Sequence, residues 1–170
     1  MFGWLKKSTV DKDAVRRWRD AVTARARLPE PYLKGWVSDT IYGRFNMVTL
    51  VATLALRRLR ACGAEGRVLS KAFAEMLFSD FDHALRENGV GDASIARRIR
   101  KMGEEFYGLA KAIDEALEAG APQKEIAAVL QRNVQPDRDK AMALADYLLL
   151  LSERVDDLSD ATALAGPDEI

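Results

Sequence analysis

Apolar side chains recur along this chain at intervals of three or four residues, the spacing of one face of an α-helix. Residues 92–119 show the pattern most clearly. No stretch alternates apolar and polar residues well enough to predict a strand. The chain is therefore predicted to be all-α. The apolar positions of the clearest stretch are Ile95, Ile99, Met102, Phe106, Leu109, Ile113 and Leu117.

Helix-breaking and helix-capping residues divide this pattern into segments. Pro29 stops a first helix, and Gly63 follows a second one that Asp39 or Thr40 can cap. Asp137 can cap the last helix. A loop or one-turn helix is expected near 32–37. The predicted helices cover residues 11–27, 40–61, 67–87, 92–119, 122–132 and 137–158.

A chain of 170 residues can build one domain with a real core, but not two ordinary ones. We expect a single compact domain of six to seven helices over residues 11–158. Residues 1–10 are expected to be flexible, and residues 159–170 to form an acidic, disordered tail. The last helix is apolar all round from Tyr147 to Leu151, so it is predicted to be the most buried.

Composition narrows the class of protein. The longest apolar run, residues 45–56, is shorter than the about 20 residues that cross a bilayer, so no membrane span is predicted. The N-terminus has no apolar stretch typical of a signal peptide. Cys62 is the single cysteine, which rules out an internal disulfide and favours a reducing compartment. It is expected to be an inert small hydrophobe, with a reactive thiol as the alternative.

Charge is balanced over the whole chain but not along it. Residues 1–70 carry 14 Lys/Arg and 6 Asp/Glu, and residues 71–170 carry 12 and 20. The basic front half could lie against anionic lipid or RNA, or the two halves could attract each other within the fold. The sequence leaves these alternatives open. No motif for specific DNA binding is present.

Residues 81–92, FDHALRENGVGD, raise two chemical alternatives. A metal site at His83 could use Asp80 and Glu87 on the same helical face, but the chain has only one histidine and one cysteine. A phosphate-binding glycine loop follows a strand, whereas this one follows a helix. The simpler interpretation is a helix that ends at Gly89, a bend at Gly91 and a cap at Asp92. No catalytic residue, cofactor or metal site is therefore predicted.

Two blocks of residues resemble a known family. The first runs Leu85-Arg86-Glu87-Asn88-Gly89-Val90-Gly91-Asp92, and is followed by Lys101-Met102 and Phe106-Tyr107-Gly108. The second comprises Ser38-Asp39-Thr40, Gly43-Arg44-Phe45 and Arg58-Leu59. Together they resemble the ubiquinol–cytochrome c chaperone family over about residues 25 to 155.

The resemblance implies an assembly factor for the cytochrome bc1 complex (respiratory complex III), not an enzyme. Its expected partner is newly made cytochrome b or another bc1 subunit. A second assembly factor, the ribosome and the surface of an anionic membrane are further expected contacts. Because the chain has no extension like a transit peptide, it looks like a bacterial member. It would act in the cytoplasm or peripherally on the cytoplasmic face of the inner membrane.

Candidate partner-binding residues follow from the resemblance and from the surplus of apolar and charged side chains. The turn Gly89, Val90, Gly91 and Asp92 is the family signature. Three positions depart from the family pattern as Asn46, Leu50-Val51 and Leu109, which puts polar contacts there in doubt. A helical adaptor with no respiratory role is the alternative function. The candidate partner-binding residues are Trp36, Tyr42, Arg44, Phe45, Arg86, Glu87, Lys101 and Tyr107.

Overall fold

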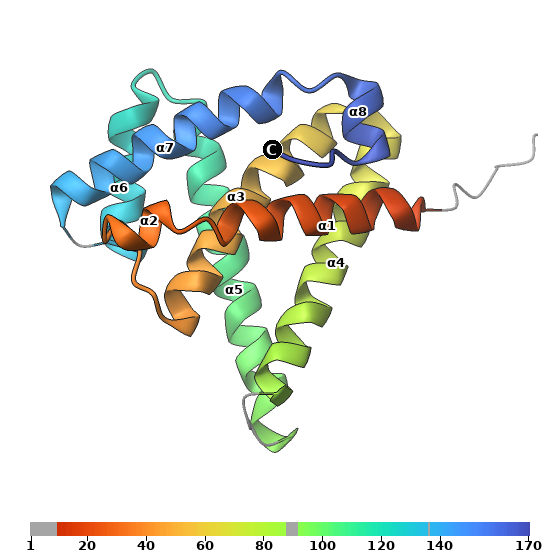
Figure 1. Ribbon diagram of the computed structural model, residues 1–170, viewed down its shortest axis with the longest axis horizontal. Coiled ribbons are helices and arrows are strands. Elements are labelled where there is room, and N and C mark those ends of the chain that lie inside the picture. The colour runs from red at the N-terminus through yellow and green to blue at the C-terminus, as the bar shows by residue number, and fades with distance from the viewer. Residues whose placement is uncertain (1–9, 88–91, 136) are drawn as a thin grey trace, which may run out of the picture.

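The computed structural model describes residues 10–87, 92–135 and 137–170, and within them every regular element is a helix (Figure 1). The predicted all-α class is confirmed. Two of the helices are short, at four and six residues. The helices are α1 (Lys12–Ala26), α2 (Glu30–Leu33), α3 (Ile41–Ala61), α4 (Gly63–Glu87), α5 (Asp92–Leu117), α6 (Pro122–Asn133), α7 (Arg138–Asp156) and α8 (Asp160–Ala165).

The centre of the molecule is α3, which packs against α1, α4, α5, α7 and α8. Two of its buried polar side chains bond within the helix, which helps it to be buried on nearly all sides. The hydroxyl of Thr49 donates to the carbonyl of Phe45 at 2.9 Å, and that of Thr53 donates to the carbonyl of Thr49 at 2.8 Å. These bonds satisfy hydroxyls that would otherwise oppose burial.

The prediction that the last long helix is the most buried is wrong. Leu148 and Leu151 of α7 are buried, but Leu150 between them is 60% exposed. The reason is position, since α7 covers one side of α3 and α6 and faces outward on the other. A run of four leucines occurs both in buried and in partly exposed helices, so its composition alone does not predict how deeply the helix is buried.

Helices α4 and α5 form a long hairpin that projects from the body of the molecule (Figure 1). Gly63 begins α4 with φ of 74°, a conformation that favours glycine, and it lets the chain turn sharply after α3. As a result, α4 begins four residues earlier than predicted. The family-signature residues Gly89, Val90 and Gly91 lie outside the described residues, as does the side chain of Asp92.

The C-terminal segment differs from the disordered tail that the sequence predicts. Ser159 caps α8 by accepting a hydrogen bond from the backbone of Thr162 at 3.1 Å. The buried indole of Trp18 on α1 then donates to the carbonyl of Ala163 at 2.8 Å. Arg25 donates to the carbonyl of Ile170 at 2.6 Å. The small residues of the tail thus pack closely on α1, which a pattern of charges along the chain does not reveal.

Candidate partner-binding surface

Six aromatic rings form one continuous row across α3, α4 and α5, which we call the aromatic ridge. Neighbouring ring centroids lie 5.2 to 6.1 Å apart, within the range in which aromatic pairs attract each other. The row joins helices that are far apart in sequence. Its members in spatial order are Tyr42, Phe45, Phe81, Phe78, Phe106 and Tyr107.

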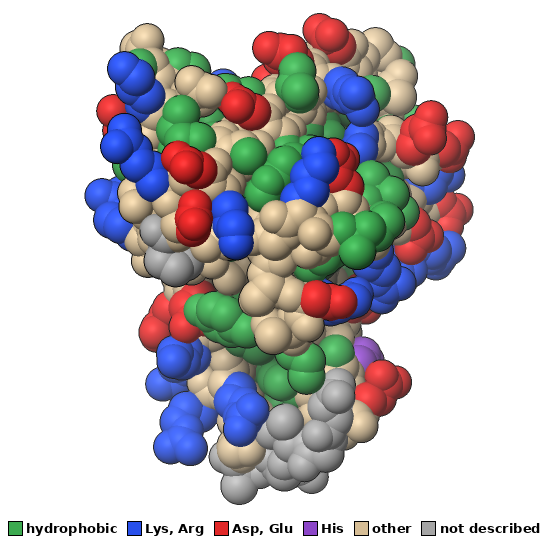
Figure 2. Space-filling view, turned by 60° about the vertical axis from the view of Figure 1, so that its left-hand side comes forward, with side chains coloured by type: hydrophobic (Ala, Val, Ile, Leu, Met, Phe, Trp, Pro, Cys, Tyr) green, Lys and Arg blue, Asp and Glu red, His purple; other side chains and the backbone are tan. Residues whose placement is uncertain are grey.

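The aromatic ridge is buried in the middle and open at its two ends. Phe45 and Phe106 belong to the core, whereas Tyr42 is 54% and Tyr107 is 56% exposed. Ile41, beside Tyr42, is 69% exposed. Figure 2 shows apolar side chains beside a group of Lys and Arg side chains on the lower part of the molecule. Apolar residues of this size on the surface are typical of sites that bind partners.

Local structure at the start of α3 sets the direction of Tyr42. Thr40 caps the helix by accepting a hydrogen bond from the backbone of Gly43 at 3.0 Å, and its hydroxyl lies 3.1 Å from that of Ser38. A side chain at Gly43 would meet the carbonyl of Ser38 at 1.9 Å, so this close approach requires glycine. The loop before α3 is therefore held against its first turn.

A hollow of about 330 Å³ opens beside Tyr42, between α3, α5 and α6. Asn46 lies at its floor, one turn after Tyr42 on α3, and is only 6% exposed. Burial raises the pKa of the Tyr42 phenol, and a hydrogen bond to the Glu105 carboxylate raises it further. The residues that line the hollow are Tyr42, Asn46, Glu104, Glu105, Gly108, Leu109 and Asn133.

The structure brings three of the candidate residues together and sets two others apart. Tyr42, Phe45 and Tyr107 are members of the aromatic ridge. Trp36 instead lies against the ring of Tyr147 on α7, with centroids 6.1 Å apart. Arg44 donates to Asp39 at 2.8 Å and stacks on the ring of Tyr32, so it braces the loop that precedes α3.

The charged candidates lie on the α4–α5 hairpin. Arg86 donates to Asp82 at 2.7 Å, four residues earlier on α4, and Glu87 is exposed at the end of that helix. Lys101 of α5 lies 3.7 Å from Glu105, again within one helix. Pairs of this kind on a helix surface stabilise it only slightly, by about 0.2–0.5 kcal/mol. Each side chain can therefore exchange its partner at low cost.

His83 is exposed on α4, and of the two acids considered with it as metal ligands, Asp80 has another partner. Asp80 lies 3.6 Å from Arg19 of α1, and Asp82 pairs with Arg86. Among the described residues, no group of three or more His, Cys, Asp or Glu side chains is placed to hold a metal ion. The same part of the chain has no helix long and apolar enough to cross a bilayer.

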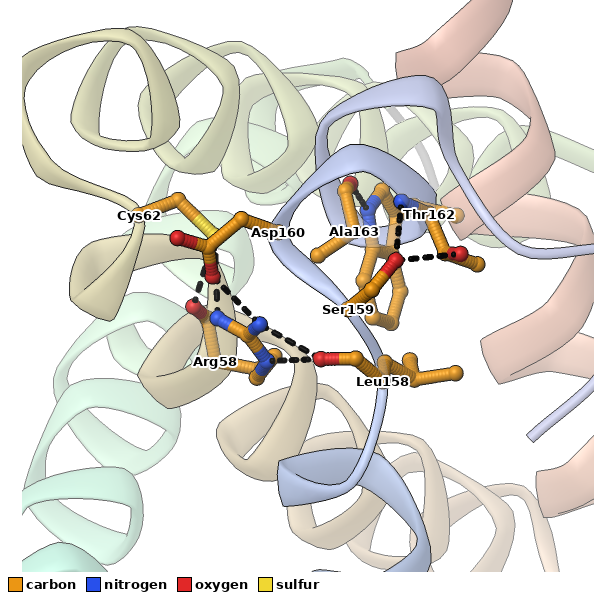
Figure 3. A network of polar contacts seen from close by, with 8 residues as sticks. Arg58, Cys62, Leu158, Ser159, Asp160, Thr162 and Ala163 are labelled. Atoms are coloured by element: carbon orange, nitrogen blue, oxygen red, sulfur yellow. Dashed lines mark hydrogen bonds and ion pairs between the residues drawn. The ribbon is translucent and has the colours of Figure 1, made fainter.

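A second polar cluster, the C-terminal latch (Arg58, Cys62 and Asp160), joins α3 to α8 (Figure 3). The buried Arg58 guanidinium donates to the carbonyl of Leu158 at 3.1 Å, to Asp160 at 2.6 Å and to the Cys62 sulfur at 3.0 Å. Burial raises the pKa of the Cys62 thiol, which keeps it protonated and a poor nucleophile. The latch therefore connects two segments of the fold.

The two oppositely charged halves of the chain are joined by ion pairs between helices. Arg57 lies 3.1 Å from Asp114 and 3.0 Å from Glu118, and Arg60 lies 2.9 Å from Asp114. The latch adds a further pair, between Arg58 and Asp160. Part of the basic character of the front half is thus paired with acids of the back half of the same chain.

The chain is similar to known proteins in both sequence and structure. Residues 35–168 match the model of the family described as ubiquinol–cytochrome C chaperone. The chain belongs to the ubiquinol–cytochrome c chaperone family. A solved structure, the Cbp3 homolog from Brucella abortus, is similar with a TM-score of 0.83 and 32% identity. The similarity covers 96% of this chain and 91% of that one. No curated protein matches the sequence.

The aromatic ridge lies within the part of the chain that matches the chaperone family. The family match begins after α2 and extends through α8, so it includes every residue of the ridge and the C-terminal latch. The sequence does not reveal that Asn46, Glu104 and Glu105 share one hollow, because Asn46 lies on a different helix, far from the two glutamates in the chain. It also does not single out Ile41 and Leu33, the latter 84% exposed. Only their exposure distinguishes them, and a single sequence does not show it.

Proposed function

We propose that this chaperone-family protein assists assembly of the cytochrome bc1 complex by holding newly made cytochrome b or another apolar subunit of that complex. The observation that carries the proposal is the aromatic ridge, whose exposed ends Tyr42 and Tyr107 rest on buried phenylalanines. A rigid aromatic surface can bind an apolar segment without first ordering its own side chains.

Contact with an anionic membrane is the second part of the proposal. Arg97, Arg98 and Arg100 are exposed on α5, and none of them pairs with an acid in the described part of the chain. Each cation near an anionic surface contributes about 1 kcal/mol of attraction. We therefore propose that the hairpin makes the membrane contact; the sequence left open whether the basic front half meets anionic lipid, RNA or the acidic half of the chain. A second assembly factor and the ribosome remain further proposed partners.

A crosslinking experiment tests the client. A photoreactive amino acid at Tyr107 should crosslink to cytochrome b in membranes in which that subunit has just been made. The same amino acid at Leu150 serves as the control, because Leu150 is equally exposed but lies on α7, outside the ridge. Crosslinks from both positions would show nonspecific stickiness, and crosslinks only to soluble proteins would favour the helical adaptor instead.

Deletion of the gene tests the pathway. We expect lower levels of bc1 haem in the absorption spectrum and restoration by the wild-type chain. Normal bc1 spectra in the deletion strain would overturn the proposal and leave the adaptor without a respiratory role as the better interpretation.

A further inference from the structure

The hollow beside Tyr42 has the size of a site for one side chain. Its volume of about 330 Å³ lies at the lower end of the range for ligand pockets, roughly 300–1,000 Å³. Three helices contribute to it, which fixes the relative positions of its polar groups. It is therefore too small for a large cofactor and well suited to a single long side chain.

Asn46 is the most deeply placed polar side chain of the hollow. It is more than nine-tenths buried, and the hollow is where its remaining accessible surface lies. Most buried polar groups in proteins have a hydrogen-bond partner. An occupant of the hollow can therefore bond to the Asn46 amide.

The rim of the hollow is acidic. Glu105 accepts a hydrogen bond from the Tyr42 phenol, and Lys101 lies 3.7 Å from the same carboxylate. Glu104 makes no ion pair within the described residues and is exposed. Consecutive residues of a helix point in directions about 100° apart, so Glu104 and Glu105 approach the hollow from two sides. Acceptors thus outnumber donors around the space.

Gly108 lines the hollow and has no side chain that would fill it. It lies in the middle of α5, where glycine is less favourable than alanine, and a side chain there would meet nothing within 4 Å. Packing therefore does not require glycine at this position. A larger residue would, however, extend into the hollow that Gly108 lines.

We propose that the hollow binds one arginine side chain of the client polypeptide. A guanidinium can donate to Glu104, Glu105 and Asn46 at once, and it can stack on the exposed ring of Tyr42. This inference rests on the proposed function, because the client is taken to be a membrane subunit. Membrane proteins carry an excess of arginine and lysine in their short cytoplasmic loops, next to apolar segments. The aromatic ridge and the acidic hollow together match that pairing.

A pair of matched peptides tests the chemistry directly. One amidated peptide carries two leucines and one arginine, and the other carries citrulline, which has the same shape but no charge. Titration into the full chain, followed by amide NMR signals of Tyr42, Asn46 and Gly108, should give saturable shifts with the arginine peptide. Because a charged hydrogen bond is lost, the citrulline peptide should bind about tenfold more weakly.

Four variants keep the test independent of folding. Glu104→Gln should weaken binding of the arginine peptide about threefold to tenfold, since it removes one carboxylate. Asn46→Leu and Gly108→Leu should abolish it without lowering the melting temperature, because they remove a buried amide and a helical glycine. Lys101→Gln should tighten binding by removing the competing cation. Glu115→Gln is the control, since Glu115 is an exposed acid of α5 outside the hollow.

Equal affinity for the two peptides, or unchanged binding in Glu104→Gln and Gly108→Leu, would overturn the proposal. The outcome is separable from that of the proposed function. A failed peptide titration together with a crosslink from Tyr107 to cytochrome b would remove the arginine site and keep the chaperone. Peptide binding with normal bc1 spectra in the deletion strain would do the reverse.

Discussion

Phe78 on α4 and Tyr107 on α5 stack with their ring centroids 5.8 Å apart and their planes inclined by 27°. Phe78 also meets Phe81 and Phe106 edge to face, so one half-buried ring supports the exposed end of the aromatic ridge. Two side chains in direct contact can thus have different roles, one in stability and the other in binding. Substitutions at the two positions should therefore have different effects.

Tyr107→Ala should impair client binding more than stability. The side chain is 56% exposed, so its loss should lower the free energy of unfolding by less than about 1 kcal/mol. Crosslinking to cytochrome b and bc1 haem content in a complemented deletion strain should both fall. Urea denaturation of the pure variant gives the stability. Unchanged bc1 content would show that this end of the ridge does not meet the client.

Phe78→Ala should behave in the opposite way. Its ring lies against three other aromatic rings, and truncation of such a ring destabilises by roughly 2–4 kcal/mol. In urea denaturation we expect a lower midpoint concentration and an unchanged dependence of the free energy of unfolding on urea concentration. Phe78→Leu keeps most of the volume and serves as the matched control. A loss below 1 kcal/mol in Phe78→Ala would mean that α5 does not depend on this contact.

The C-terminal latch should make stability depend on pH at the acidic end. The Arg58 guanidinium lowers the pKa of the Asp160 carboxyl below its ordinary value of 3.8. A carboxyl whose pKa is lowered by folding adds stability above its unfolded pKa, and this contribution disappears as pH falls through the folded pKa. The stability difference between wild type and Asp160→Asn should therefore be constant near neutral pH and shrink below about pH 4. A difference that does not change with pH would exclude the ion pair as its source.

Thr40→Ala should loosen the start of α3. Loss of this cap should lower the free energy of unfolding by about 1 kcal/mol, as for other threonine caps. Because the same turn directs Tyr42, binding of the arginine peptide should also weaken. Ser159→Ala removes the comparable cap of α8 and should leave peptide binding unchanged. Thermal melts and the peptide titration together check both effects.

Helix positions were predictable because local signals agree with the three-dimensional structure. Pro29, Thr40 and Asp137 act within a few residues of themselves, and the predicted helix ends that depend on them fall within two residues of the observed ones. The family resemblance was predictable from two short blocks and is confirmed by the family match. Both kinds of information are carried by neighbours in the chain.

Relations between distant residues were not predictable in this way. Tyr42, Phe78 and Tyr107 lie on three different helices, and no spacing in the sequence indicates that these helices pack with their aromatic rings in one row. The surroundings of α7 and the docking of α8 on α1 likewise depend on which surfaces remain uncovered after the core has formed. Asn46 looks like an ordinary departure from a family pattern until its burial and its place in the hollow are seen together.

The bond from Trp18 to Ala163 also sets an order of events during synthesis. The two residues are separated by 145 positions. The indole of Trp18 on α1 therefore stays uncovered until α8, near the end of the chain, has been made. Contacts of such long range form late, and domains that depend on them finish folding only after most of the chain has left the ribosome. The docking of α8 on α1 is therefore expected to be among the last steps in the folding of this chain, after the helices between them have formed.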